Sequence, residues 1–159
     1  MIHIGIDPGI SGAVGAIDDQ ANLILCADLP VISQGKLRWI DAPELTSMLM
    51  KAKDGHASRI TVERSQAMPG QGVSSTFCIG VVLGSILAAC QQVAVPIDLV
   101  SAAQWKNAMG LNTDKAASLS LARLQFPTAE LDRKKDHNRA EALCIALWAL
   151  KAWSGKVAA

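Results

Sequence analysis

The chain opens with a strand and a tight turn that limit how the rest of it can fold. Isoleucine alternates with other residues from Ile2 to Asp7, a period of two that predicts a strand with one apolar face. Asp7 then lies on the other face, at the end of the strand. Proline and glycines at 8–12 predict a tight turn, so the apolar run Ala13 to Ile17 is expected to return as an antiparallel neighbour.

A carboxylate at such a position has two interpretations. Asp7 would be held on rigid backbone beside glycines that let a bulky phosphate approach, which suits metal-assisted phosphate chemistry. The alternative is a turn aspartate that caps local N–H groups, which is common in Asp-Pro-Gly segments. Further carboxylates in matching positions are needed to favour the first interpretation.

Length and composition predict one domain, residues 1–159, with a hydrophobic fraction of 50% that argues against disorder. The longest apolar run, Phe77 to Cys90, contains two glycines and is shorter than the ~18 residues of a membrane span, so no membrane association is expected. The first residues lack the basic and apolar segments of a secretory signal. Four widely spaced cysteines in apolar surroundings predict reduced core thiols of a cytoplasmic protein.

Charge is unevenly distributed along the chain, although the net charge is only +1. Through Val100 there are six basic and nine acidic residues, whereas Ser101 onward holds nine basic and five acidic residues. Such asymmetry permits a polyanionic partner without requiring one, because basic residues on solvated helix faces are common.

Hydrophobic periodicity and turn residues predict an α/β fold with a five-stranded mixed sheet flanked by helices. A strand at Leu23 to Leu29 would complete a three-strand antiparallel meander, and strands at Arg59–Glu63 and Val93–Val100 would add in parallel after crossover helices. Pro96 suggests an edge position for the last strand. The predicted helices run from the capping box at Asp41 to about Lys53, over Ser74–Gln92, from Ser101, from a cap at Thr113 to Gln125, and over Ala140–Leu150.

A second carboxylate, Glu63, ends the strand that is expected to pair in parallel with the first. Sites in open parallel sheets gather at the carboxyl ends of adjacent strands, so Glu63 is expected near Asp7. The polar, glycine-rich loop Arg64 to Gly72 follows and is expected to face substrate.

Small residues recur every fourth position in the predicted helix Ser74–Gln92, at Gly80, Gly84 and Ala88. This spacing allows close backbone approach. It predicts packing against the sheet, with a helix-to-helix dimer contact as the alternative.

Two further acids lie near the end of the chain. Glu141 is the only acid in the apolar helix Ala140–Leu150, and burial of a carboxylate there is costly unless it is paired or bound to metal. An exposed position for Glu141 is equally compatible with the pattern. Asp136 lies at or before the helix cap, and His137, one turn before Glu141, is a competing ligand.

The order of these features resembles that of the RNase H-like nucleases, and specifically the RuvC-like Holliday junction resolvases. Three segments spread over nearly the whole chain carry the resemblance: Gly5–Gly12, Val62–Glu63 and Asp136–Leu143. Sugar-kinase and actin-like ATPases share the first motif, but the three motifs in this order favour the resolvases. The compact length and the Trp105-Lys106 and Asp114-Lys115 segments look most like the phage-type branch.

The resemblance implies an RNase H-like fold in which Asp7, Glu63 and Glu141 are metal ligands, with Asp136 as the fourth acid or His137 as the alternative ligand. Bacterial relatives place the last two ligands three residues apart, and position 138 here is Asn. They also carry an aromatic wedge in the loop after the second acid, where this chain offers Met68 instead.

The implied activity is hydrolysis of branched DNA, especially four-way junctions, by a homodimer with two Mg²⁺ or Mn²⁺ ions in each active site. The alternatives are a nuclease for structured RNA, a non-catalytic junction-binding protein and, more distantly, an ATP-binding fragment of the actin-like fold. The expected location is the cytoplasm, that of the host if a phage encodes the chain. The residues expected to hold the DNA backbone are all basic: Arg64, Lys106, Lys115, Arg133, Lys134, Lys135 and Arg139.

Overall fold

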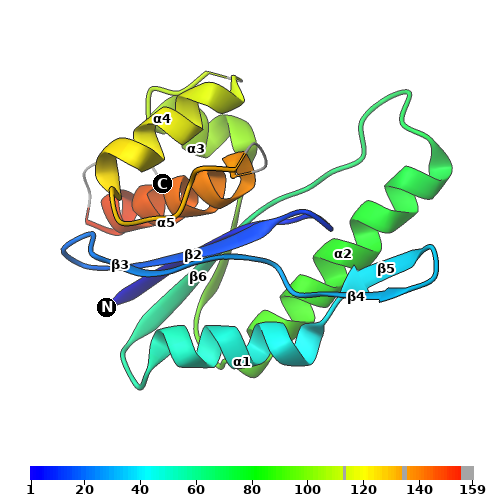
Figure 1. The fold of residues 1–159 in the computed structure, drawn as a ribbon, viewed down its shortest axis with the longest axis horizontal. Helices are drawn as coiled ribbons and strands as arrows, with labels where there is room; N and C mark the ends of the chain where they lie inside the picture. Colours follow the sequence, from blue (N-terminus) through cyan, green and yellow to red (C-terminus); the bar gives the residue numbers. More distant parts are fainter. Residues whose placement is uncertain (113, 134–135, 155–159) are drawn as a thin grey trace.

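The computed structural model describes residues 1–112, 114–133 and 136–154, which form a mixed sheet between two layers of helices (Figure 1). The five strands lie in the order β3-β2-β1-β6-β7. β1 to β3 form the antiparallel meander, and β6 and β7 continue the sheet in parallel with β1. The predicted fold class is therefore confirmed. The strands are β1 (Ile2–Asp7), β2 (Ala13–Asp18), β3 (Leu23–Asp28), β6 (Ser58–Glu63) and β7 (Ile97–Val100).

The helices divide between the two faces of the sheet (Figure 1). α1 and α2 cover the face that carries Ile2, Ile4 and Ile6, and α3, α4 and α5 cover the other. The alternation in β1 thus directs Asp7 toward the face beneath α5. The helices are α1 (Ala42–Lys53), α2 (Val73–Gln92), α3 (Ala102–Ala108), α4 (Lys115–Gln125) and α5 (His137–Trp153).

α5 packs directly on the backbone of β1 and β2 because both strands have glycine at the contact. A Cβ atom at Gly5 would lie 2.5 Å from the amide nitrogen of Ala146 and still closer to the carbonyl oxygen of Ala142. At Gly15 it would lie 2.9 Å from the amide nitrogen of Leu143. Any side chain at either strand position would lift the helix off the sheet.

Local capping accounts for most helix starts. The Asp41 carboxylate accepts from the amide of Glu44 at 3.1 Å, as the predicted capping box requires. The expected cap of α4 at Thr113 was wrong, because Asp114 accepts from the amide of Ala116 at 2.9 Å; Thr113 itself lies outside the described residues.

The last strand begins later than predicted, since the backbone of Ala94 has a positive φ of 54°. As Pro96 suggested, β7 is an edge strand.

A two-stranded sheet that was not predicted from the sequence lies between β3 and α1. β4 (Val31–Gln34) pairs with β5 (Leu37–Ile40) across the turn at Gly35 and Lys36. Gly35 has a positive φ of 60°, the conformation that two-residue hairpin turns favour. The Gly-Lys pair between two short apolar segments was therefore the available signal.

Much of the surface of α2 is open to solvent, which makes the predicted packing of its small residues against the sheet wrong. A Cβ atom at Gly80 or Gly84 would meet no atom within 4 Å, and Cys78 is exposed rather than in the core. The residues of α2 that do pack in the core are Val82, Ile86, Ala89 and Cys90. By length and composition alone the 20-residue helix could also cross a membrane, with 22% of the apolar window buried.

The glycine contact beneath α5 predicts a large loss of stability on substitution. Gly5→Ala should lower the free energy of unfolding by at least about 3 kcal/mol, because the added methyl group clashes with backbone atoms that cannot move independently. Urea denaturation measures this loss. Gly9→Ala is the matched control in the neighbouring turn, where a Cβ would have its nearest neighbour at 3.5 Å; an equal loss in both variants would contradict the explanation.

Candidate active site

Two carboxylates lie at the carboxyl ends of two adjacent parallel strands, β1 and β6. β1 and β6 pair in a register that aligns Ile6 with Val62, so Asp7 and Glu63 are the next residues of their strands. Glu63 also aligns with Val100 of β7, and α3 begins immediately after that strand. The chain therefore enters α3 beside Glu63.

The third carboxylate comes from the first turns of α5. Glu141 precedes Ala142, whose carbonyl oxygen faces Gly5, and only 7% of its surface is exposed. Its Oε1 atom lies 2.6 Å from the Nζ atom of Lys106 on α3. The interpretation of Glu141 as a buried, paired acid is thus the one that the structure supports, and the exposed alternative does not apply.

Glu63 is half-buried and has an unusual environment. The indole Nε1 of Trp105 donates to its Oε2 atom at 2.7 Å. Burial raises the pKa of Glu63, and the negative charge of Glu141 raises it further, against the opposing effects of Trp105 and Lys106. Glu63 and Glu141 are therefore close enough to repel one another, and a cation between them would be stabilised.

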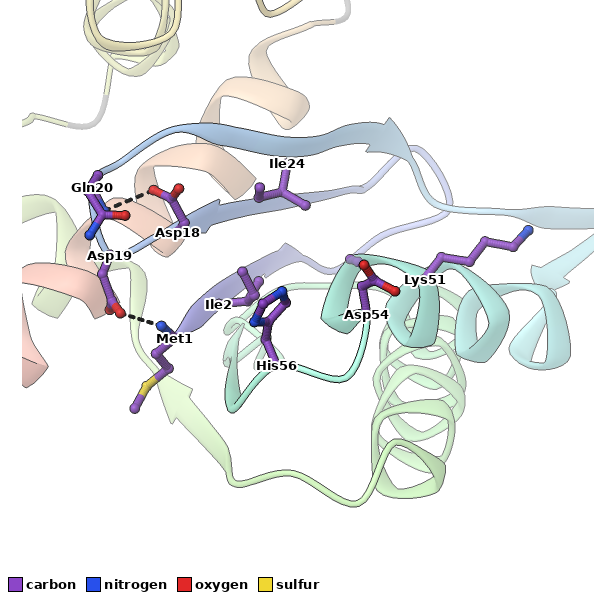
Figure 2. A pocket seen from close by; sticks show the side chains of 10 residues that line it. Met1, Ile2, Asp18, Asp19, Gln20, Ile24, Lys51, Asp54 and His56 are labelled. Atoms are coloured by element: carbon purple, nitrogen blue, oxygen red, sulfur yellow. Dashed lines mark hydrogen bonds and ion pairs between the residues drawn. The ribbon is translucent and has the colours of Figure 1, made fainter.

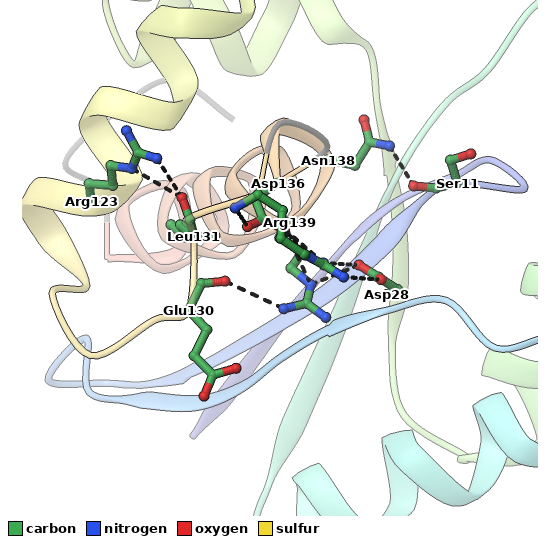
Figure 3. Close-up of polar contacts among 9 residues, drawn as sticks. Ser11, Asp28, Arg123, Glu130, Leu131, Asp136, Asn138 and Arg139 are labelled. Carbon is green, nitrogen blue, oxygen red and sulfur yellow. Dashed lines mark hydrogen bonds and ion pairs between the residues drawn. The ribbon is translucent and has the colours of Figure 1, made fainter.

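Asp136 has a different set of contacts (Figure 3). Its side chain is fully buried, and the Arg133 guanidinium lies 2.7 Å from its Oδ1 atom. Burial alone would raise the pKa of Asp136, but the hydrogen bonds from Arg133 outweigh it and hold the pKa below its ordinary value. Asp28 at the end of β3 binds the guanidinium groups of both Arg133 and Arg139, at 2.9 and 2.7 Å. We call Asp28, Arg133, Asp136 and Arg139 the α5 entry network.

Asn138 also has a defined partner. Its side-chain amide donates to the carbonyl oxygen of Ser11 in the β1–β2 turn (Figure 3). Since Asn138 lies three residues before Glu141, where bacterial resolvases are expected to place a ligand, this position here connects the helix to the first turn instead. Together with the α5 entry network, it fixes the first turn of α5 against the sheet.

The other residues predicted to bind metal or DNA lie on different elements of the chain. His137 is the first residue of α5 and is partly buried, and Arg64 is exposed at the start of the loop after β6. Lys115 begins α4, and its side chain is outside the described part. Lys134 and Lys135 also lie outside the described residues.

Carboxylate oxygens are the ligands that Mg²⁺ and Mn²⁺ prefer. Within residues 1–112, 114–133 and 136–154, no three His, Cys, Asp or Glu side chains lie close enough to form a metal site. Instead, Trp105 and Lys106 hold Glu63 and Glu141. The donor chemistry fits a divalent cation, because Glu63 and Glu141 are close enough to repel one another and the Lys106 ammonium already pairs with Glu141.

A cleft of about 670 Å³ adjoins this edge of the sheet. Glu63 and Arg64 line it together with Pro8, Met68 and Ser101, among others. Met68 has 64% of its surface exposed. This cleft gives a large substrate direct access to Glu63.

A second pocket, of about 390 Å³, lies at the other end of β1 (Figure 2). Two of its acids have local partners: Asp19 pairs with the amino terminus, and Asp18 accepts from the amides of Gln20 and Asn22 at 2.9 and 2.8 Å. These two carboxylates stabilise the β2–β3 turn and the start of β1.

Sequence reasoning gave no role to Trp105 or Asp28. Trp105 follows a Ser-Ala-Ala-Gln helix start directly after a strand, which places it on the first turn beside the strand ends. That pattern could have linked it to Glu63. Asp28 had no comparable signal, because its arginine partners lie 105 and 111 residues away in the sequence.

Comparison with solved structures defines the class of fold. The chain superposes on T. thermophilus RuvC in complex with a Holliday junction substrate with a TM-score of 0.69 at 22% identity, covering 99% of this chain and 98% of that one. It also matches yeast mitochondrial Holliday junction resolvase Ydc2, with a TM-score of 0.52 at 17% identity, over 96% of this chain and 78% of that one. The protein therefore has the RNase H-like fold of RuvC.

Sequence comparison points to the same group of proteins. The chain is 37% identical over 95 residues to the chloroplastic Holliday junction resolvase MOC1 of Chlamydomonas reinhardtii, a match over 57% of this chain but only 11% of that protein. No family model matches the chain. The similarity to RuvC-like resolvases that the three motifs indicated thus agrees with both comparisons.

The α5 entry network predicts a pH-dependent contribution to stability. Because the folded pKa of Asp136 is lowered from 3.8, its ion pair stabilises the fold above pH 3.8 and is lost as the pH falls through the folded pKa. Asp136→Asn should therefore lower the melting temperature near neutral pH, and the difference from wild type should narrow below pH 3.8.

Thermal denaturation followed by circular dichroism across this pH range measures the effect. Asp132→Asn, at an exposed acid in the same segment, is the control and should leave the curve unchanged. A difference for Asp136→Asn that persists undiminished in acid would contradict the ion-pair explanation.

Proposed function

We propose that this chain is a structure-specific endodeoxyribonuclease that resolves four-way and related branched DNA junctions by metal-dependent hydrolysis of phosphodiester bonds. The observation that carries the proposal is the approach of Glu141 to Glu63 at the strand end beside Asp7, in a fold shared with RuvC. The sequence similarity to MOC1, named as a Holliday junction resolvase, supports the same substrate.

In this proposal Asp7, Glu63 and Glu141 hold two Mg²⁺ or Mn²⁺ ions. Bound there, the ions would supply Lewis acidity and an activated water for hydrolysis. Asp136 and His137 are the two candidates for a fourth ligand. Asp136 would have to leave Arg133 to bind metal, and His137 lies one turn before Glu141.

The basic residues would hold the DNA backbone around the cleft, with binding that weakens as salt rises. Arg64 is exposed at the cleft and is free of the α5 entry network. Arg133 and Arg139 already pair with Asp28, so each guanidinium would be shared between phosphate and Asp28. Lys106, Lys115, Lys134 and Lys135 complete the proposed set, and exposed Met68 is the proposed apolar wedge.

We also propose that the protein is a homodimer that joins through α2. Val73 and Phe77 have 87% and 71% of their surfaces exposed, and the open positions at Gly80 and Gly84 allow a second helix to approach closely. A four-way junction has near two-fold symmetry, so a two-fold dimer presents one active site to each of two opposing strands. The proposed location is the cytoplasm, or the host cytoplasm for a phage protein, where the free cysteines stay reduced.

Cleavage of a synthetic four-way DNA junction in Mg²⁺ or Mn²⁺ tests the catalytic proposal. Wild-type protein should place paired, symmetric nicks in the junction and leave linear duplex of the same sequence intact. Asp7→Asn should lose cleavage by at least about a hundredfold while it still binds the junction, because the variant lacks one metal-binding carboxylate.

Three results would favour the other functions. Binding of the junction without cleavage in either metal would indicate a non-catalytic junction-binding protein. Preferential cleavage of structured RNA in a direct comparison would indicate the RNA nuclease. Nucleotide binding would point to the more distant actin-like ATPases.

Sedimentation equilibrium tests the dimer. Phe77→Glu should convert the wild-type dimer to a monomer, because it places a charge in the apolar contact. Leu124→Glu on α4 is the matched control, since Leu124 is an equally exposed apolar residue away from α2. A monomeric wild type, or a Phe77→Glu variant that remains dimeric, would contradict this interface.

A further inference from the structure

Two consecutive residues of α3 hold two different carboxylates of the candidate site. The indole Nε1 of Trp105 donates to Glu63 at 2.7 Å, and the ammonium of Lys106 lies 2.6 Å from Glu141. Glu63 and Glu141 come from β6 and α5, so α3 connects the two elements that contribute these carboxylates.

The Trp105 contact is rigid. Trp105 is fully buried and packs in the core cluster that includes Phe126, Leu131 and Leu143. Ser101, directly after β7, accepts from the amide of Gln104 at 3.2 Å and so caps α3 beside Glu63. A buried ring on an anchored helix leaves the indole N–H one direction in which to donate.

The Lys106 contact differs because it is ionic and its side chain reaches the solvent. The side chain of Lys106 is 15% exposed. It carries its ammonium group at the end of a flexible four-carbon stem. That ammonium is the cation the structure places against Glu141, and it also lies 5.1 Å from the centre of the Trp105 ring. The Lys106 ammonium therefore contacts both Glu141 and the ring that holds Glu63.

We propose that Lys106 is a resident cation that neutralises Glu141 in the metal-free protein and must be displaced before a divalent ion can bind there. Trp105 is the positioning residue that keeps Glu63 in place during the exchange. The inference rests on the proposed metal-dependent function. Its physical basis is charge compensation, since removal of the ammonium would leave the repulsion between Glu63 and Glu141 uncompensated.

Competition between Lys106 and metal is measured by Mn²⁺ titration, with free Mn²⁺ detected by electron paramagnetic resonance. Lys106→Gln keeps an N–H donor for Glu141 but removes the charge, and should bind Mn²⁺ about tenfold more tightly than wild type. Lys106→Arg keeps the charge and should bind no more tightly than wild type. Lys51→Met removes an exposed lysine on α1 and should leave the affinity unchanged.

The metal-free melting temperature provides a second measurement that does not depend on activity. Lys106→Gln should melt below wild type without metal and gain more than wild type on addition of Mn²⁺. Equal or weaker Mn²⁺ affinity in Lys106→Gln would overturn the inference, because Lys106 would then support metal binding or have no part in it.

The two proposals fail in different ways. A wild type that binds Mn²⁺ and cleaves junctions, with unchanged affinity in Lys106→Gln, overturns only the role of Lys106. A wild type that binds no Mn²⁺ overturns both the competition and the metal-dependent function.

Discussion

The structure depends on the contact between α5 and the backbone of β1 and β2. Glycine at positions 5 and 15 lets the helix lie so close that an added methyl group would overlap its main chain. This contact sets the height of Glu141 above the sheet, because Ala142, the next residue, faces Gly5. A helix held away by side chains would carry Glu141 away from Glu63. Gly5 of the first motif therefore has a packing role.

A second constraint fixes how α5 begins. The α5 entry network ties the segment before the helix to the end of β3, and Asn138 ties its first turn to the β1–β2 turn. Hydrogen-bonded networks of charged groups hold geometry well when every member has a partner. The buried carboxylate of Asp136 thus acts as a structural acid in the described conformation, while Glu141, five residues later, faces the strand ends.

The sequence predicted the sheet order and the position of the main carboxylates because both follow from local rules. Alternation placed Asp7 on one face of β1, and the crossover through α1 made β6 its parallel neighbour. It could not predict that Asp28 joins the Arg133–Asp136 pair, because Asp28 and Arg133 are brought together only by tertiary structure. The spacing of Gly80 and Gly84 likewise indicated that another backbone can approach α2 closely, but it did not identify that backbone. The prediction that it would be the sheet was wrong.

Charge balance links the fold to the chemistry of the site. Glu63 and Glu141 repel one another. α3 contacts each of them with a different group, a neutral N–H donor for Glu63 and an ammonium for Glu141. The neutral donor orients a carboxylate without using up its negative charge, whereas the ammonium compensates that charge. With this division, Glu63 keeps its full negative charge, whereas the charge of Glu141 is compensated. Because Trp105 and Lys106 are adjacent on one short helix, a shift of α3 would alter both contacts together.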